Sequence, residues 1–241
     1  MLTLLTPTGS RPEAFALCEQ WIAAQRDAPW SRWIVVDDGD IPTPVTMGQH
    51  VIRRQPDGKA DPPHTLSLNL RTAIAHIGTL GADDRLCIIE DDDYYGPDYL
   101  RTVTDWLDCH EVVGESGSKY WHIGLRGYKR VKARIYAALC RTSIKGPAAF
   151  DALRCAAADD HWSVDKRLWQ NWAGSRLLWF DRAGDSHLHV GIKGMPGRVS
   201  PLHAVQEYTP DPDYAMLRHW CGDAWRIYAD ICERTESPCL T

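Results

Sequence analysis

The sequence predicts an α/β fold, with a mixed sheet flanked by helices and a further helix at the C-terminus. Short apolar runs alternate with stretches of helical periodicity along the first hundred residues. Two of these runs, residues 33–36 and 87–89, lead directly into clustered carboxylates. The 241 residues, with 44% hydrophobic content, are enough to bury a full core in one large domain. Since open α/β sheets bind ligands at the carboxyl ends of their strands, the acids mark the expected site.

The first half of the chain has the element order of a nucleotide-binding α/β unit. Apolar or β-branched runs predict strands, and apolar residues spaced by three and four predict helices. Proline favours the first position of a helix, so Pro12 marks the start of the first one. We expect strands at residues 2–5, 33–36, 51–53 and 86–89, with helices at residues 12–22 and 66–77. Strand, helix, strand, strand, helix, strand places the loops on one edge of the sheet.

The acid cluster, residues 90–93, is the most informative stretch of the chain. Four consecutive carboxylates repel one another, so solvent, a basic neighbour or a divalent cation must compensate their charge. Carboxylate oxygens suit hard cations such as Mg²⁺ or Mn²⁺. Asp93 could instead cap a helix that starts near Pro97, but capping explains one acid and not four. We therefore favour a metal site.

The middle of the chain combines basic and aromatic residues. A helix is expected at residues 98–107, with strands at 111–114 and 120–125. Residues 119–134 form a basic run that contains no acid and is interleaved with Tyr120, Trp121 and Tyr128. Such a run is usually a solvated face, but it is also what a phosphate-bearing or nucleic-acid partner needs. The basic run consists of Lys119, Arg126, Lys129, Arg130, Lys132 and Arg134.

Three later stretches complete the expected structure. Asp159 and Asp160 open a helix that ends before Gly174, as capping residues or as functional acids. Glycines in and near residues 187–198 predict a mobile loop rather than core. Residues 214–234 have the apolar periodicity of one amphipathic helix, packed on the sheet or used in a dimer.

Three motifs in the correct order and spacing resemble the family-2 glycosyltransferases of the GT-A fold. The first is Thr6-Pro7-Thr8 with Arg11-Pro12, and the second is Val35-Val36-Asp37-Asp38-Gly39. The third is Glu90-x-Asp92-Asp93, followed by Pro97 and Leu100. The resemblance covers about the first hundred residues, and a weaker part recurs near residue 160. It implies a nucleotide-sugar donor, usually a uridine diphosphate sugar, and a divalent cation, Mn²⁺ or Mg²⁺.

The resemblance also implies roles for individual residues. Asp92 and Asp93 would hold the metal with a histidine, for which His187, His189 and His203 are the candidates. Asp160, or its neighbour Asp159, would take the proton of the acceptor hydroxyl, with inversion at the anomeric carbon. Lys193 and Arg198 would close over the diphosphate. The implied donor site consists of Thr6, Pro7, Thr8, Arg11, Asp37, Asp38, Glu90, Asp91, Lys193 and Arg198.

Several acceptors are compatible with the resemblance. The basic run lies between the donor half and the proposed base, and it favours a large anionic acceptor. DNA that carries hydroxylated bases, as some bacteriophages make, is the first candidate, with Trp121 or Tyr128 stacking on a flipped base. A polysaccharide or protein acceptor is the alternative. A sugar-nucleotide nucleotidyltransferase and a non-catalytic nucleotide-binding module are the competing functions.

Charge, cysteines and hydropathy set the remaining expectations. The net charge of −5 gives no overall reason to expect a nucleic-acid partner. The eight cysteines lack C-x-x-C spacing and are expected to be free thiols. No apolar run approaches the roughly 20 residues that span a bilayer, and no leader pattern is present, so a cytoplasmic location is expected. Residues 1–205 are expected to form the GT-A-like domain, and residues 206–241 a helical extension packed on it.

Overall fold

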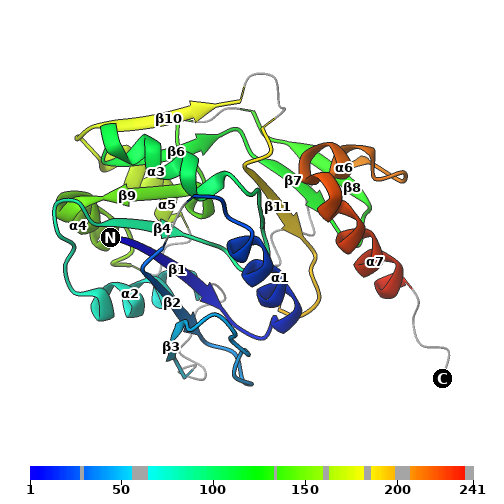
Figure 1. Ribbon diagram of the computed structural model, residues 1–241, viewed down its shortest axis with the longest axis horizontal. Helices are drawn as coiled ribbons and strands as arrows, with labels where there is room; N and C mark the ends of the chain where they lie inside the picture. Colours follow the sequence, from blue (N-terminus) through cyan, green and yellow to red (C-terminus); the bar gives the residue numbers. More distant parts are fainter. Residues whose placement is uncertain are drawn as a thin grey trace.

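The computed structural model describes residues 1–27, 30–55, 65–132, 135–159, 163–181, 186–198 and 207–236. The described strands form two sheets (Figure 1). The larger sheet has the strand order β10-β6-β9-β4-β1-β2-β3, and the smaller one has the order β12-β8-β7-β11-β5. In Figure 1 the larger sheet runs from β10 at the top to β3 at the bottom, and the smaller sheet lies to its right.

The larger sheet is parallel except at one strand. β1 (Leu2–Thr8) pairs in parallel with β2 (Arg32–Asp37) and β4 (Arg85–Ile88), and β2 pairs with β3 (His50–Arg53). β9 (Thr142–Lys145) lies antiparallel between β4 and β6 (Val112–Ser116), and β10 (Arg176–Phe180) is parallel to β6. The expected mixed sheet is therefore confirmed.

β1 is longer than the sequence suggested because it continues through Thr6, Pro7 and Thr8. Thr8 accepts a backbone hydrogen bond from Asp38 on the β2 side, whereas Leu5 accepts one from the β4 side. Backbone groups alternate between the two neighbours in a parallel strand, so Pro7 faces the β4 side. Pairing with β4 ends at Leu5, so the ladder does not need the N–H that proline lacks.

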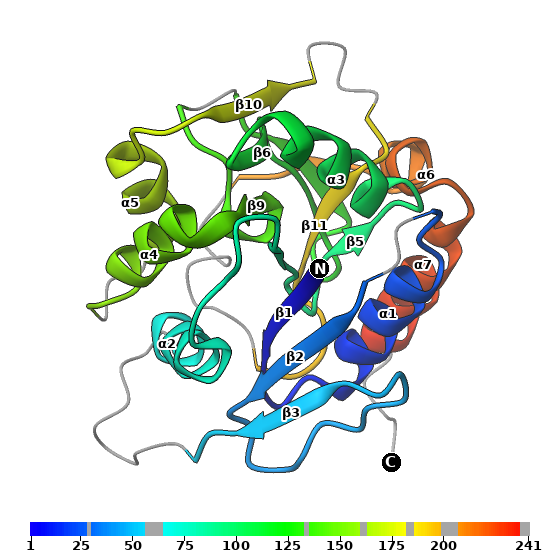
Figure 2. The same ribbon diagram turned by 60° about the vertical axis from the view of Figure 1, so that its left-hand side comes forward.

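Helices cover both faces of the larger sheet, and alternate strand residues point into two separate cores. One core contains Trp33 and Val35 with α1 (Pro12–Ala23) and α3 (Tyr99–Cys109). The other contains Ile34 and Val36 with the helices on the opposite face. Figure 2 shows these two groups of helices on either side of the strands. The helices of the second face are α2 (Leu66–Ile77), α4 (Gly146–Ala156) and α5 (Val164–Asn171).

The smaller sheet joins segments from three parts of the chain. β11 (His189–Lys193) pairs antiparallel with β5 (Tyr94–Tyr95) and in parallel with β7 (Lys119–His122). β8 (Gly127–Arg130) lies between β7 and β12 (Thr209–Pro210). The expectation of a mobile loop at residues 187–198 is wrong for its central part, because all five residues of β11 are buried. Gly191 fits there because a Cβ would lie 2.4 Å from the Tyr120 ring.

The C-terminal segment is two helices and not the single helix that its periodicity suggested. α6 (Ala215–Cys221) and α7 (Trp225–Glu236) are separated by a 3₁₀ turn, Gly222–Ala224. Gly222 has a φ of +53°, outside the helical region, so the chain changes direction there. α7 packs beside α1, where Trp21 Nε1 donates to the Tyr228 hydroxyl at 3.0 Å (Figure 2). The expected domain boundary at residues 205 and 206 falls outside the described residues and stays a prediction.

The remaining expectations concern cysteines and hydropathy. The seven cysteines within the described residues are all free thiols, as expected, and Cys239 lies outside them. Among the described helices, none combines the length and the apolar character that a bilayer crossing requires.

Candidate active site

The acid cluster forms a turn between β4 and β5. The Tyr95 hydroxyl holds this turn, because it accepts the backbone N–H of Glu90 at 2.9 Å and donates to the Cys140 carbonyl at 3.1 Å. β5 begins directly after the acids and pairs with β11. The turn therefore lies against residues that are distant in sequence.

Asp93 is the buried centre of the cluster. One carboxylate oxygen accepts the Ile192 backbone N–H at 3.1 Å and the Lys193 ammonium at 3.0 Å. The other oxygen contacts His189 Nε2 at 2.9 Å. Burial alone would raise the pKa of Asp93, but Lys193 and His189 hold it well below its usual range. Asp93 is therefore an ionised carboxylate with both oxygens occupied.

His189 is neutral and acts as a donor to Asp93. Burial lowers the pKa of His189 to about 4, although the nearby Asp93 carboxylate opposes this shift. A neutral imidazole that contacts a carboxylate through Nε2 must carry its proton there. Its Nδ1 atom is buried and has no hydrogen-bond partner among the residues described.

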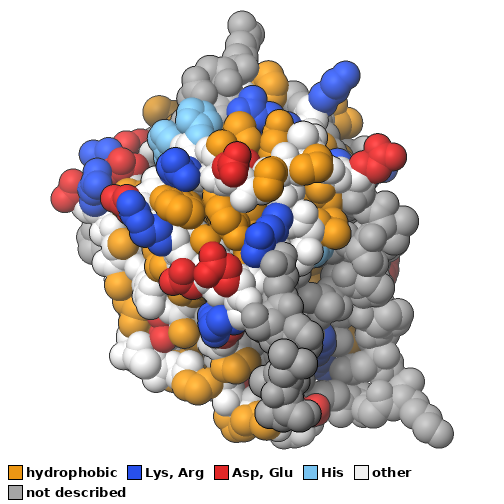
Figure 3. Space-filling view, turned by 90° about the vertical axis from the view of Figure 1, so that its right-hand side faces the viewer, with side chains coloured by type: hydrophobic (Ala, Val, Ile, Leu, Met, Phe, Trp, Pro, Cys, Tyr) orange, Lys and Arg blue, Asp and Glu red, His pale blue; other side chains and the backbone are white. Residues whose placement is uncertain are grey.

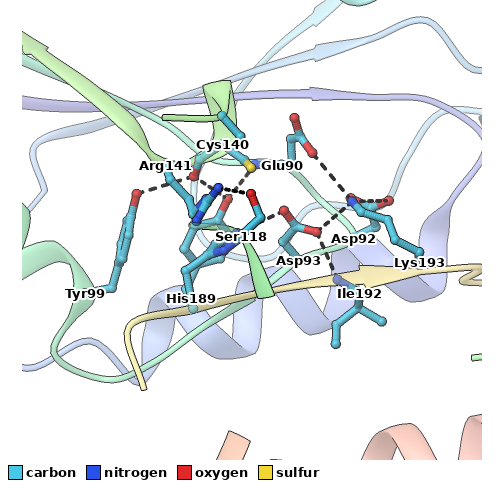
Figure 4. A network of polar contacts seen from close by, with 12 residues as sticks. Glu90, Asp92, Asp93, Tyr99, Ser118, Cys140, Arg141, His189, Ile192 and Lys193 are labelled. Atoms are coloured by element: carbon cyan, nitrogen blue, oxygen red, sulfur yellow. Dashed lines mark hydrogen bonds and ion pairs between the residues drawn. The ribbon is translucent and has the colours of Figure 1, made fainter. Parts of the chain in front are cut away.

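Lys193 places its ammonium group among three carboxylates (Figure 4). Its Nζ lies 3.0 Å from Asp93 Oδ1, and 3.9 Å from both Glu90 Oε2 and Asp92 Oδ2. Burial would lower the pKa of Lys193, but the three acids raise it well above its usual value. The side chain is about 6% exposed, so Lys193 is a buried and permanently charged cation.

Arg11 is a second cation in contact with the cluster. Its guanidinium lies 2.6 Å from Asp91 Oδ1 and donates to Asp92 Oδ2 at 2.9 Å. The Thr8 hydroxyl donates to the other oxygen of Asp91 at 2.6 Å. Arg11 follows the carboxyl end of β1, so the sheet itself brings this cation to the acids. Of the three ways to compensate the acids, the structure shows basic neighbours, Arg11 and Lys193.

Two acids of the cluster are harder to ionise than usual. Burial, together with Asp93, raises the pKa of Glu90 to about 8, although Lys193 opposes the shift. Burial also raises the pKa of Asp91 to about 6, against the opposing effect of Arg11. Perturbed carboxyl groups of this kind are typical of functional sites.

The loop after β2 lies beside this turn. Asp38 is buried and accepts hydrogen bonds from Arg54, at 2.9 Å, and from Arg198. Gly9 is required here, because a Cβ would lie 2.0 Å from Asp38 Oδ1 and 2.7 Å from the Arg198 guanidinium. The loops after β1 and β2 therefore meet the segment after β11.

Asp37 stabilises its own loop. One of its oxygens accepts the Gly39 backbone N–H at 2.9 Å. The other accepts the Thr43 N–H at 2.7 Å and also contacts the Arg53 guanidinium. Asp37 is fully buried, and its neighbours already use both of its oxygens.

A cavity of about 680 Å³ opens beside the acid cluster. Glu90 and Lys193 lie on its wall, so the cavity reaches the edge of the cluster. Its volume is in the range of small-molecule binding sites. Sequence reasoning missed its wall residues Leu66, Cys140, Asp165 and Tyr208, since they come from separated segments with no shared motif. The other lining residues are Tyr120, Lys129, Arg130, Val131, Lys132, Ala138, Leu139 and Val164.

Neither a family model nor a curated protein matches the sequence. Solved structures of S. aureus TarS match the fold. One covers 79% of this chain and 36% of TarS, with a TM-score of 0.52 and 14% identity. TarS 1–349 with UDP gives a TM-score of 0.52 and 14% identity, over 79% of this chain and 60% of the other. TarS 1–349 with UDP-GlcNAc gives a TM-score of 0.51 and 16% identity, and the match covers 90% of this chain and 64% of the other.

The fold is GT-A-like. This confirms the fold expected from the three motifs in the first hundred residues. The chain spans between about a third and two thirds of the TarS chains it matches. At this identity the similarity establishes the fold alone.

This GT-A-like fold brings most of the expected site residues together. The acid cluster, Thr8, Arg11, His189 and Lys193 form one contact network, and Asp38 with Arg198 lies beside it. Lys193 differs from what we expected, because it belongs to a buried strand and not to a closing loop. The closing role of Arg198 stays a prediction.

Other expected site residues lie elsewhere. Thr6 is buried under Trp33, whose indole donates to it at 3.0 Å. His187 Nδ1 contacts the Trp220 carbonyl at 3.1 Å and makes no described contact with the acids. Asp159 is exposed and pairs with Arg167 at 2.9 Å. Asp160, His203 and Arg134 lie outside the described residues, so their roles stay predictions.

The basic run divides into buried and cavity-facing residues. Lys119 is 4% exposed and pairs with Glu115 at 3.7 Å and Asp181 at 3.6 Å. Trp121 is fully buried, and its indole donates to Asp211 at 3.1 Å. The expectation that Trp121 stacks on a base, or that Lys119 contacts a partner, is therefore wrong. The residues of the run that line the cavity are Lys129, Arg130 and Lys132.

The outer side of this region is not a continuous basic surface. Figure 3 views the side on which α6 and α7 lie, and shows basic side chains separated by acidic and hydrophobic ones. Arg126 lies over the Tyr214 ring at 5.7 Å and Arg130 over the Trp220 ring at 5.5 Å. Each of these two cations packs on an aromatic face, and Arg130 is exposed as well.

The acid cluster fits a divalent cation only in part. Glu90, Asp92 and Asp93 each offer an oxygen within 4.8 Å of the others, and Asp92 Oδ1 is buried without a partner among the described residues. However, Asp93 has both oxygens occupied, and the Lys193 ammonium lies among the same three carboxylates. A metal held by all three would have to displace Lys193.

Proposed function

We propose that this protein transfers a sugar from a nucleoside-diphosphate donor to an acceptor hydroxyl. The observation that carries the proposal is the cavity beside the acid cluster, in a fold shared with TarS structures that hold UDP and UDP-GlcNAc. Such ligands bind outside the carboxyl ends of parallel strands, and the cavity reaches the carboxyl end of β4 at Glu90. A UDP-sugar is accordingly the first donor to test.

The proposed reaction is a single displacement with inversion. The acceptor oxygen attacks the anomeric carbon while the bond from that carbon to the diphosphate oxygen breaks. Asp160 takes the acceptor proton, and the diphosphate leaves with the bonding electrons. Lys193, on the cavity wall, would stabilise the negative charge that develops on the leaving group.

Product analysis tests the proposal against its alternatives. We expect UDP to bind in a calorimetric titration, and UDP-sugars to release UDP slowly even when water is the only acceptor. A nucleotidyltransferase would instead release pyrophosphate from a nucleoside triphosphate and a sugar phosphate. A binding module would bind UDP without any turnover. Failure to bind UDP, GDP or CDP would reject the nucleotide site itself.

The base assignment gives the next prediction. Asp160→Asn should lower kcat roughly 100-fold or more, because the amide cannot accept a proton, while donor affinity changes little. Asp159→Asn is the matched control, since Asp159 is exposed and paired with Arg167. Steady-state kinetics of both variants decide the assignment. If the Asp159 variant loses activity and the Asp160 variant keeps it, the base is Asp159.

The acceptor is proposed to be anionic, with DNA that carries hydroxylated bases as the first candidate. Lys129, Arg130 and Lys132 support this because they line the same cavity as Glu90. Tyr128 is partly buried and its ring contacts Trp220 at 5.7 Å, so base stacking would use only the exposed part of this ring. A neutral polysaccharide or a protein is the alternative acceptor.

Salt dependence separates these acceptors. If DNA binds, replacing both Lys129 and Arg130 by alanine should flatten the slope of log K against log salt by roughly one to two units. Lys166→Ala provides an exposed control outside the cavity and should leave the slope unchanged. Fluorescence anisotropy with hydroxymethylated duplex DNA measures the slope. Salt-insensitive transfer to a neutral oligosaccharide, without DNA binding at low salt, would end the DNA proposal.

A further inference from the structure

We propose that Lys193 replaces the divalent cation of the donor site, so that a nucleoside diphosphate binds here without a metal ion. The inference rests on the proposed function, but it concerns a different property of the site. Its basis is the position of a buried ammonium group among Glu90, Asp92 and Asp93, where the resemblance would place a metal.

The ammonium competes with a metal for both space and charge. Mg²⁺ needs oxygen ligands at about 2.1 Å in octahedral geometry, so an ion shared by the three acids would lie close to the present Nζ. Two cations at that separation repel strongly in a buried site. Asp93 has little capacity left for a metal, because Oδ1 already accepts from Ile192 and Lys193 and Oδ2 contacts His189. Ligand exchange would therefore require Lys193 to leave.

The backbone of Lys193 is fixed by strand pairing. It is the last residue of β11, which is paired on one edge with β5 and on the other with β7. Close packing of the Tyr120 ring on Gly191 fixes the approach of β7, and the same ring lies 5.7 Å from Lys193 Nζ. The backbone of Lys193 is therefore fixed, and the contact with Asp93 at 3.0 Å holds its ammonium group.

The remaining charges of the cluster are also compensated from within the protein. Arg11 pairs with Asp91 and Asp92 from the side of β1. Lys193 uses one of its three N–H donors on Asp93, while Glu90 and Asp92 lie beyond hydrogen-bond distance at 3.9 Å. Since Lys193 also lines the cavity, its other donors are available to phosphate oxygens.

Two measurements on the intact protein test the inference. Electron paramagnetic resonance of Mn²⁺ reports whether the protein binds the ion, and calorimetry reports UDP affinity in EDTA and in Mn²⁺. For the wild type we expect no stoichiometric Mn²⁺ binding below millimolar concentration, and UDP affinities in the two buffers that agree within about twofold. Lys193→Met should weaken UDP binding in EDTA at least tenfold, and should create a Mn²⁺ site that restores it.

Controls keep the test decisive. Lys145→Met removes a lysine that pairs with Asp83 at 3.9 Å, away from the cavity, and should behave as the wild type. Lys193→Arg retains the charge and should keep metal-free UDP binding if Lys193→Met fails to fold. Wild-type UDP binding that requires Mn²⁺, or stoichiometric Mn²⁺ binding by the wild type, would overturn the inference and leave the proposed function intact. If UDP does not bind in either buffer, the proposed function fails, and the Mn²⁺ titration still decides whether the acids accept a metal.

Discussion

Replacing Asp93 by alanine is expected to lower the free energy of unfolding by about 3–5 kcal/mol, because it removes the nearest counter-ion of the buried Lys193 ammonium. Asp93 binds the Lys193 ammonium at 3.0 Å, the His189 ring at 2.9 Å and the Ile192 backbone at 3.1 Å. All three donors would lose an acceptor at once in a site that water hardly reaches. Urea denaturation monitored by tryptophan fluorescence measures the loss.

Two further variants show whether the charge causes this effect. Asp93→Asn keeps the shape and one carbonyl acceptor, so it should cost less than the alanine variant. Asp83→Ala removes an exposed carboxylate that lies 3.9 Å from Lys145, and it should change stability by less than about 0.5 kcal/mol. An alanine variant at position 93 as stable as the wild type would mean that Lys193 is not held by this carboxylate.

Trp121→Ala is expected to destabilise the protein by a similar amount, about 3–5 kcal/mol, through the cavity that it leaves. Trp121 is fully buried between the smaller sheet and the C-terminal segment, 5.8 Å from the Tyr214 ring. Its indole donates to Asp211, which also accepts the backbone N–H groups of Met216 and Leu217 at the start of α6. The substitution therefore loosens α6 as well as β7.

A less buried tryptophan provides the control for this prediction. Trp179 lies in β10, at the edge of the larger sheet, and packs against Trp106 at 5.6 Å. Trp179→Ala should cost clearly less in thermal denaturation than Trp121→Ala. If Trp121→Ala instead left stability unchanged and removed activity, Trp121 would have to be a substrate contact, against its burial.

The half of the fold that could be predicted is the half built from local patterns. β2, β3 and α2 were expected within a residue or two, because apolar runs bounded by acids and polar loops specify them without help from distant segments. The acid cluster was placed correctly after β4 for the same reason. The motifs of this half also predicted the GT-A-like fold.

The other half depends on contacts that the local sequence does not show. β11 contains Gly191 and begins at His189, yet it is a buried strand because Tyr120 packs on Gly191 and β5 pairs with its start. Lys119 belongs to the basic run in the sequence, but pairing with Glu115 and Asp181 allows its burial. The sequence allows a basic neighbour to compensate the acid cluster. Only the pairing of β5 with β11 shows that Lys193 is such a neighbour.

The pairing of β5 with β11 also has a consequence for the order of folding. Asp93 and Lys193 are 100 positions apart, so the acids leave the ribosome long before their buried counter-ion exists. Arg11 is already present and can pair with Asp91 and Asp92 at that stage. Contacts of such long sequence separation form slowly, since the intervening chain must first be ordered. We therefore expect Asp93 to stay hydrated while the N-terminal half forms. The acid turn closes when β11 pairs with β5, in the last stage of folding.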